Sequence, residues 1–102
     1  MEEKRECCHT TKTKERTEKE YKDLIHRLNR IEGQGRGIKK MVESDTYCTD
    51  ILIQVSAVNA ALNSFSKVLL GNHIRTCVAE DIRQGKEETV EELVATLQKL
   101  MK

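Results

Sequence analysis

Residues 45–77, DTYCTDILIQVSAVNAALNSFSKVLLGNHIRTC, combine a long helical pattern with soft metal ligands at both ends. Apolar residues recur through this stretch at steps of three and four, which is typical of a helix with one buried face. These residues are Ile51, Val55, Val58, Leu62, Phe65 and Leu69. Asp45 is expected to cap the N-terminus of the helix. The stretch therefore predicts one long helix near the centre of the chain.

The ligands are His73 and Cys77 at one end of this stretch and Cys48 at the other. His73 and Cys77 are four residues apart, so they project from one helix face and can bind the same ion. Cys48 lies near the helix start, where the dipole favours the thiolate that binds metals. Because a helix rises about 1.5 Å per residue, Cys48 would lie on the order of 40 Å from the other two ligands. One chain alone cannot close this site.

Two antiparallel copies would solve this problem, because the start of one helix would meet the end of the other. A two-fold axis would then build two identical sites, so the ligand spacing predicts a dimer. Two thiolates and one imidazole suit three-coordinate Cu(I), whereas Zn(II) normally takes a fourth ligand. The alternative interpretation is that the cysteines are small core residues and the histidine is an ordinary helical side chain.

Composition limits the class of protein. The 102 residues, with 37% hydrophobic and 3% aromatic content, predict one domain whose core needs oligomerisation. No apolar run is long enough to span a bilayer, and no apolar signal region follows the charged N-terminus. We expect a cytoplasmic protein with no membrane partner, in which the four cysteines are thiols or metal ligands. The net charge of +1 neither requires nor excludes nucleic acid.

The N-terminal segment differs from the rest of the chain. Residues 1–18 are charged and polar, which predicts a flexible arm before a helical domain over residues 19–102. Cys7, Cys8 and His9 in this arm are either an auxiliary site for a soft metal or an incidental cluster. We expect no enzymatic activity, because no oxyanion donor or cofactor motif accompanies His73 and Cys77.

The first long helix is predicted over about residues 18–43 and carries excess positive charge. Residues 22–40 hold six basic and two acidic side chains, a local charge of +4. Such a surface fits a nucleic acid backbone but is also typical of a solvated helix face. Gly33, Gly35 and Gly37 suggest that another backbone packs closely on this helix. The candidate DNA contacts are Arg27, Arg30, Arg36, Lys39 and Lys40.

After Cys77 the central helix is expected to continue to Gln84 and to end at Gly85. A last helix follows, with Glu87 and Glu88 at its N-terminus. Its apolar face comprises Val90, Leu93, Val94, Leu97, Leu100 and Met101. The chain has no proline, which is consistent with three long helices.

Three motifs of this chain occur together: Arg27-Leu28-Asn29-Arg30-Ile31-Glu32-Gly33-Gln34, then Tyr47-Cys48, then His73 with Cys77. Over about residues 20–100 they resemble the copper-sensing operon repressor family, the CsoR/RcnR group. The family's Cys, His, Cys signature falls on Cys48, His73 and Cys77. Its Tyr and Glu beside the copper ligands fall on Tyr47 and Glu92.

The resemblance implies an all-α, three-helix protomer that forms an antiparallel four-helix-bundle dimer and then a dimer of dimers, a homotetramer. It implies a repressor that binds operator DNA in the apo form and is released when Cu(I) binds between subunits. The family's DNA-contacting residue on the first helix falls on Arg27. A second basic position of some relatives falls on Ser64, and Gly35 replaces a usual apolar residue. A copper chaperone is a further expected partner.

Other members of this group sense nickel or cobalt, formaldehyde, or persulfides, and the ligands separate them. Nickel sensors have a histidine where this chain has Cys77, and His9 lies too early to match their N-terminal ligand. Persulfide sensors lack the histidine found here as His73. Two functions remain open: a Cu(I)-responsive repressor, or a cytosolic soft-metal buffer or chaperone with the same helical dimer. The basic first helix favours the repressor, because a buffer does not need it.

Overall fold

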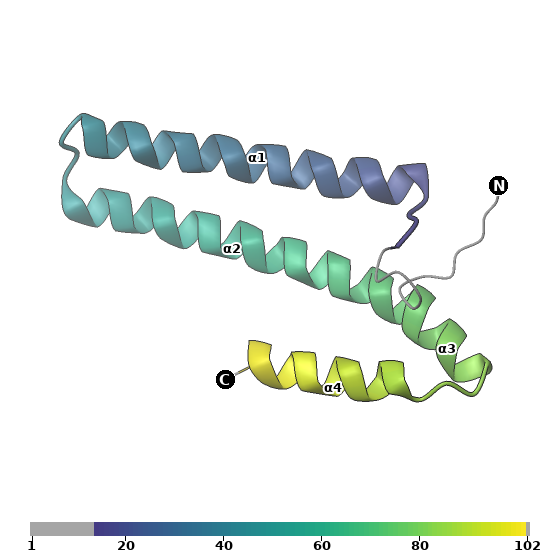
Figure 1. Ribbon diagram of the computed structural model, residues 1–102. Helices are drawn as coiled ribbons and strands as arrows, with labels where there is room; N and C mark the ends of the chain where they lie inside the picture. Colours follow the sequence, from purple (N-terminus) through teal and green to yellow (C-terminus); the bar gives the residue numbers. More distant parts are fainter. Residues whose placement is uncertain (1–13, 102) are drawn as a thin grey trace. The chain divides into compact units, whose positions relative to one another are not determined.

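The computed structural model describes residues 14–101, and within them the chain is helical with short turns (Figure 1). The elements in order are α1 (Glu18–Glu43), α2 (Cys48–His73), η1 (Ile74–Val78), α3 (Ala79–Arg83) and α4 (Glu88–Leu100). The segment η1 is π-helix and leads from α2 into α3 while the flanking backbone stays helical. The prediction of an all-α protomer with three long helices is confirmed for this part of the chain.

The start of α1 has a clear local cause. The hydroxyl of Thr17 accepts a hydrogen bond of 3.1 Å from the backbone N–H of Glu20, which satisfies one open donor of the first turn. Glu18 and Glu20 place negative charge near the positive end of the helix dipole. The candidate auxiliary ligands Cys7, Cys8 and His9 lie outside the described residues.

The turn between α1 and α2 is a Schellman motif. Asp45 has a φ of 58°, and its N–H donates to the carbonyl of Val42 at 3.1 Å. The N–H of Thr46 donates to the carbonyl of Met41 at 2.9 Å, so the last carbonyls of α1 are satisfied. The prediction that Asp45 caps the central helix is wrong: Asp45 ends α1 in the left-handed conformation, and α2 begins at Cys48.

The same motif ends α3. Gly85 has a φ of 79°, and its N–H donates to the carbonyl of Ile82 at 3.0 Å. The N–H of Lys86 donates to the carbonyl of Asp81 at 2.9 Å. The predicted helix end at Gly85 is therefore confirmed, because glycine adopts this conformation without steric cost.

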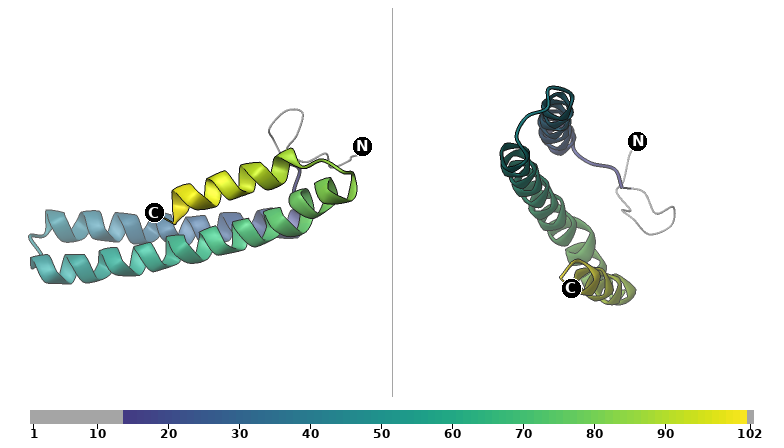
Figure 2. Two further views of the ribbon diagram at one scale, coloured as in Figure 1. Left: turned by 90° about the horizontal axis from the view of Figure 1, so that it is seen from below. Right: turned by 90° about the vertical axis from the view of Figure 1, so that its left-hand side faces the viewer.

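The chain divides into two compact units, and the first covers residues 16–69. In this unit α1 and the residues of α2 up to Leu69 run antiparallel, side by side (Figures 1 and 2). Leu24 of α1 is buried, and Ile31 and Ile38 on the same helix are partly buried. On α2 five of the six apolar residues predicted to form a buried face are partly buried, and Leu62 is instead 43% exposed.

The second unit comprises the described residues from Leu70 onward, together with the short segment before residue 16. Here α4 contacts η1. Cys77 and Val78 of η1 are buried, and so are Asp81 of α3 and Thr89 of α4. This small cluster holds the last helix and contains one of the predicted metal ligands.

Few apolar side chains are buried within one chain. Among the described residues the buried ones are Leu24, Cys77 and Val78. On α2, Leu52 and Ile53 remain 63% and 64% exposed. Large apolar side chains gathered in water usually mark a surface that another protein covers. None of the described helices combines the length and the apolar content needed to cross a membrane.

Alanine substitutions at two glycines are expected to change stability in opposite directions. Gly85→Ala should lower the free energy of unfolding by about 1–2 kcal/mol, because Ala is strained at this positive φ. Gly35→Ala should raise it by about 0.5–1 kcal/mol, because Ala favours a helix interior and its Cβ meets nothing within 4 Å. Urea denaturation at one protein concentration measures both. A destabilised Gly35→Ala variant would instead indicate that another chain packs on this glycine.

Candidate metal centre and nucleic-acid interface

Two of the three predicted metal ligands lie on successive helical turns of the second unit. His73 is the last residue of α2, and Cys77 lies in η1. The thiol of Cys77 is fully buried, and His73 is partly exposed. Single turns of π-helix inside longer helices often occur at functional sites. The predicted pairing of these residues within one chain is therefore compatible with the local structure.

Thr76 and Lys14 lie beside this pair. The hydroxyl of Thr76 donates to the carbonyl of Asn72 at 2.7 Å and lies 3.8 Å from the sulfur of Cys77. The ammonium of Lys14 donates to the same hydroxyl at 2.8 Å. Sequence patterns gave no signal for Lys14, because the contact joins positions 62 residues apart.

The environment of His73 favours the neutral imidazole. Burial lowers its pKa below 6.5, and the positive charge of Lys14 lowers the pKa further. The carboxylates of Glu92 and Asp81 act in the opposite direction and raise the pKa. A neutral imidazole is the form that binds a metal ion. The predicted place of Glu92 beside this ligand stays a prediction, and the upward effect of its charge on the His73 pKa is compatible with it.

Asp81 and Thr89 form a buried polar pair in the same unit. The hydroxyl of Thr89 donates to the carboxylate of Asp81, and each residue is only 3% exposed. Asp81 lies one helical turn beyond Cys77. Neither residue was predicted from the sequence. The four-residue spacing from Cys77 to Asp81 could have placed both residues on one helix face. No sequence pattern places Thr89 near Asp81, because Thr89 follows a turn.

The third predicted ligand, Cys48, begins α2 and has an exposed thiol that is not in a disulfide. Tyr47, before it, is 73% exposed. Among the residues described within one chain, no three His, Cys, Asp or Glu side chains are grouped to hold a metal ion. A helix of 26 residues is about 39 Å long, which accounts for this separation.

Arg27 is the best-connected of the candidate DNA contacts. Its Nε donates to both carboxylate oxygens of Asp23, at 3.3 and 3.2 Å, and its Nη1 donates to the hydroxyl of Ser64 at 3.3 Å. Its side chain is 34% exposed. Ser64, where some relatives have a basic residue, therefore helps to hold the guanidinium on α2.

The five basic candidates do not share one face of α1. At 3.6 residues per turn, Arg36 and Lys39 point roughly away from the side that carries Arg27 and Arg30. Arg36 is paired with Glu32 at 3.7 Å. Arg27 and Arg30 instead line a pocket of 310 Å³ between α1 and α2. The other lining residues are Ile31, Gln34, Ala60, Ala61 and Ser64. The basic charge is therefore split into two surfaces.

Relatives with known roles match this sequence over more than half of its length. The copper-sensing transcriptional repressor CsoR of Bacillus subtilis is 46% identical over 88 residues, which are 85% of this chain and 87% of the relative. The copper-sensing transcriptional repressor RicR of Mycobacterium tuberculosis is 49% identical over 59 residues, 58% of this chain and 62% of the relative.

Solved structures are similar as well. The copper-sensing repressor CsoR with Cu(I) from Geobacillus thermodenitrificans matches with a TM-score of 0.83 and 45% identity, over 86% of this chain and 93% of that one. The nickel-responsive transcriptional regulator InrS matches with a TM-score of 0.69 and 36% identity, over 78% and 91%. Residues 20–99 match the family described as metal-sensitive transcriptional repressor. The chain belongs to this family of metal-sensitive transcriptional repressors.

Proposed function

We propose that this chain is a Cu(I)-responsive transcriptional repressor that binds operator DNA without copper and leaves it when Cu(I) binds between two copies. The observation that carries the proposal is a soft ligand set split between two ends of one helix. Buried Cys77 and partly buried His73 lie at one end, and exposed Cys48 lies at the other. The copper-sensing relatives support the choice of metal.

The donor set fits Cu(I) on chemical grounds. Cys48 and Cys77 would supply two thiolates, and His73 would supply an imidazole whose pKa is lowered by burial. This soft, three-coordinate set suits Cu(I), whereas Zn(II) would normally take a fourth ligand. The bound ion would add a positive charge and would hold the start of α2 in one copy to the end of α2 in the other through its fixed coordination geometry.

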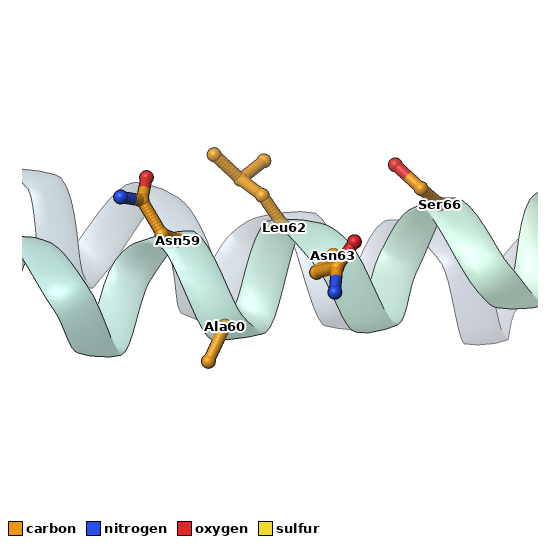
Figure 3. A pocket seen from close by; sticks show the side chains of 5 residues that line it. All are labelled: Asn59, Ala60, Leu62, Asn63 and Ser66. Atoms are coloured by element: carbon orange, nitrogen blue, oxygen red, sulfur yellow. The ribbon is translucent and has the colours of Figure 1, made fainter. Parts of the chain in front are cut away.

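The ligands also share a side of α2. A helix of 26 residues makes about seven turns, so its first and last residues, Cys48 and His73, fall on nearly the same side. Leu62, 43% exposed, lies midway along that side. Figure 3 shows Asn59, Leu62 and Ser66 pointing to one side of α2, around a shallow pocket, with Ala60 on another side. This face supports antiparallel pairing of two α2 helices.

Such pairing would place the middle of each α2 at the two-fold axis and Cys48 of one copy beside His73 and Cys77 of the other. It would also cover Leu52 and Leu62, which are exposed in one chain. A four-helix-bundle dimer, and a dimer of dimers built from it, are part of the proposal. A copper chaperone is a suitable metal donor, and the cytoplasm is the compartment we propose.

The DNA surface is proposed to centre on Arg27 and Arg30. Both line the pocket between α1 and α2, and Gln34 and Ser64 add polar groups there. Guanidinium groups held by neighbours match phosphate geometry well. Arg36, Lys39 and Lys40 form a second basic surface, which can meet DNA from the other side of α1 in an oligomer.

Tyr47 and Glu92 are proposed to carry the metal signal. Glu92 lies on α4, and its charge acts on His73. Tyr47 precedes Cys48, so a partner would bring it to the same site. Hydrogen bonds to a ligating imidazole fix its tautomer and orientation, which gives α4 a way to respond to the bound metal. No catalytic role is part of this proposal.

A binding titration with promoter DNA from upstream of the chain's own gene tests the function directly. Under anaerobic, reducing conditions the apo protein should bind this DNA, and one Cu(I) per protomer should weaken binding by about 5–150-fold, the usual range of allosteric coupling. Tight Cu(I) binding without any DNA binding would favour a metal buffer and contradict the repressor.

Exchange of subunits tests the sharing of the site. Cys48→Ala and Cys77→Ala should each abolish high-affinity Cu(I) binding while the folded oligomer remains. A mixture of the two variants should recover one intact site in each mixed dimer, because the two substitutions then fall in the same one of its two sites. Cys7→Ala serves as the matched control. Competition with a Cu(I) chelator measures the affinity, and a mixture that recovers no site would show that the ligands are not shared.

Substitution of Arg27 tests the DNA surface. Arg27→Ala should weaken operator binding and lower the slope of log affinity against log salt by about 1 for each phosphate that the arginine neutralises. Lys99→Ala on α4 removes the same charge outside the proposed surface and is the control. Fluorescence anisotropy at several salt concentrations measures both quantities. A wild-type slope in Arg27→Ala would remove Arg27 from the interface.

A further inference from the structure

We propose that the hydrogen bond between Asp81 and Thr89 is a clamp that holds α4 where Glu92 can respond to His73. Breaking this bond should uncouple metal binding from DNA release. The inference rests on the proposed function, because it concerns the signal that leaves the metal site. Asp81 and Thr89 are positioning residues in this account, and neither is a proposed metal ligand.

The clamp joins the ligand-bearing helix to the helix that carries Glu92. Asp81 lies on α3, one turn beyond Cys77, and α3 follows η1 without a turn between them. Thr89 is the second residue of α4, and Glu92 lies one turn further along. The hydroxyl of Thr89 donates to the carboxylate of Asp81 across the turn at Gly85.

The hydrogen bond between Asp81 and Thr89 is buried, so its loss would be costly in free energy. Asp81 and Thr89 are the buried polar residues among those that the structure describes, each 3% exposed. A buried carboxylate without adequate donors is costly, so Asp81 favours the arrangement in which Thr89 reaches it. The N-terminal turn of α4 also presents the positive end of its dipole to this carboxylate. The start of α4 is therefore held at a defined position on α3.

The position of Glu92 depends on this anchor. Glu92 lies on α4 and His73 ends α2, and the charge of Glu92 raises the pKa of His73. Because Thr89 anchors the start of α4 to Asp81, a change at Thr89 would move or loosen the turn that carries Glu92. The metal ligands themselves lie on α2 and η1, so they should keep their local geometry.

Three substitutions on α4 test the clamp. Thr89→Val removes the hydroxyl at nearly constant shape, Thr89→Ser keeps it, and Thr96→Val makes the same change at an exposed position of the same helix. Each protein is titrated with Cu(I) against a chelator, and with operator DNA in the presence and absence of Cu(I).

Thr89→Val should bind Cu(I), and DNA without copper, within about threefold of wild type. Its copper-dependent decrease in DNA affinity should fall from the ordinary range of about 5–150-fold to less than about threefold. Thr89→Ser and Thr96→Val should release DNA like wild type. Rescue by serine distinguishes the hydrogen bond from a general packing effect, because a purely structural role would affect metal and DNA binding together.

The double variant Asp81→Ala/Thr89→Val covers the case in which Thr89→Val does not fold, because it also removes the buried carboxylate that loses the Thr89 donor. The double variant should fold, bind Cu(I), and keep its DNA affinity nearly unchanged when Cu(I) is added. Glu92→Ala is the reference for a protein in which Cu(I) binding no longer lowers the DNA affinity. Full release by Thr89→Val or by the double variant, with impaired release by Glu92→Ala, would overturn the clamp and leave the repressor function intact. If Cu(I) does not change the DNA affinity of the wild-type protein, both the clamp and the proposed repressor function are wrong.

Discussion

The length of α2 constrains what one copy of this chain can do. The helix is continuous over 26 residues, and it separates Cys48 from His73 by roughly 39 Å. The proposed ligands at the two ends of this helix, Cys48 at one end and His73 with Cys77 at the other, therefore cannot meet within one chain. An antiparallel partner would bring the ligands together at each end of the paired helices, so a dimer would have two identical sites. On this account the metal site is a property of the dimer.

The same helix explains why the isolated chain has so small a core. Leu52 and Leu62 remain exposed, whereas the buried apolar residues in the described chain are Leu24, Cys77 and Val78. Pairing along α2 would bury the exposed side chains and assemble the ligands in one event. Metal binding and association should therefore reinforce each other, because a ligand that binds only the assembled state stabilises that state. DNA binding by several copies of α1 would use the same assembly.

Features that depend on a local pattern could be predicted from the sequence. Apolar steps predict the first helix, and Gly85 predicts a helix end. Asp45 could not be assigned correctly, because a non-glycine residue in the left-handed conformation carries little sequence signal. The contacts of Thr89 with Asp81 and of Lys14 with Thr76 were also missed, since each joins elements separated by turns or by distance along the chain. Helical spacing predicts that His73 and Cys77 share a face, and the family resemblance predicts Glu92 near them. The structure adds that the charge of Glu92 raises the pKa of His73 against the effect of burial.

Native mass spectrometry of the copper-loaded protein tests the shared site most directly. The sample should carry Cys7→Ser and Cys8→Ser, so that the N-terminal thiols cannot hold copper, and should be kept anaerobic and reduced. We predict one Cu(I) per protomer in dimers or larger assemblies and no tightly bound Cu(I) in monomers released by dilution. A monomer that retains one Cu(I), and loses it on substitution of Cys48 or Cys77, would contradict the claim that two copies build the site.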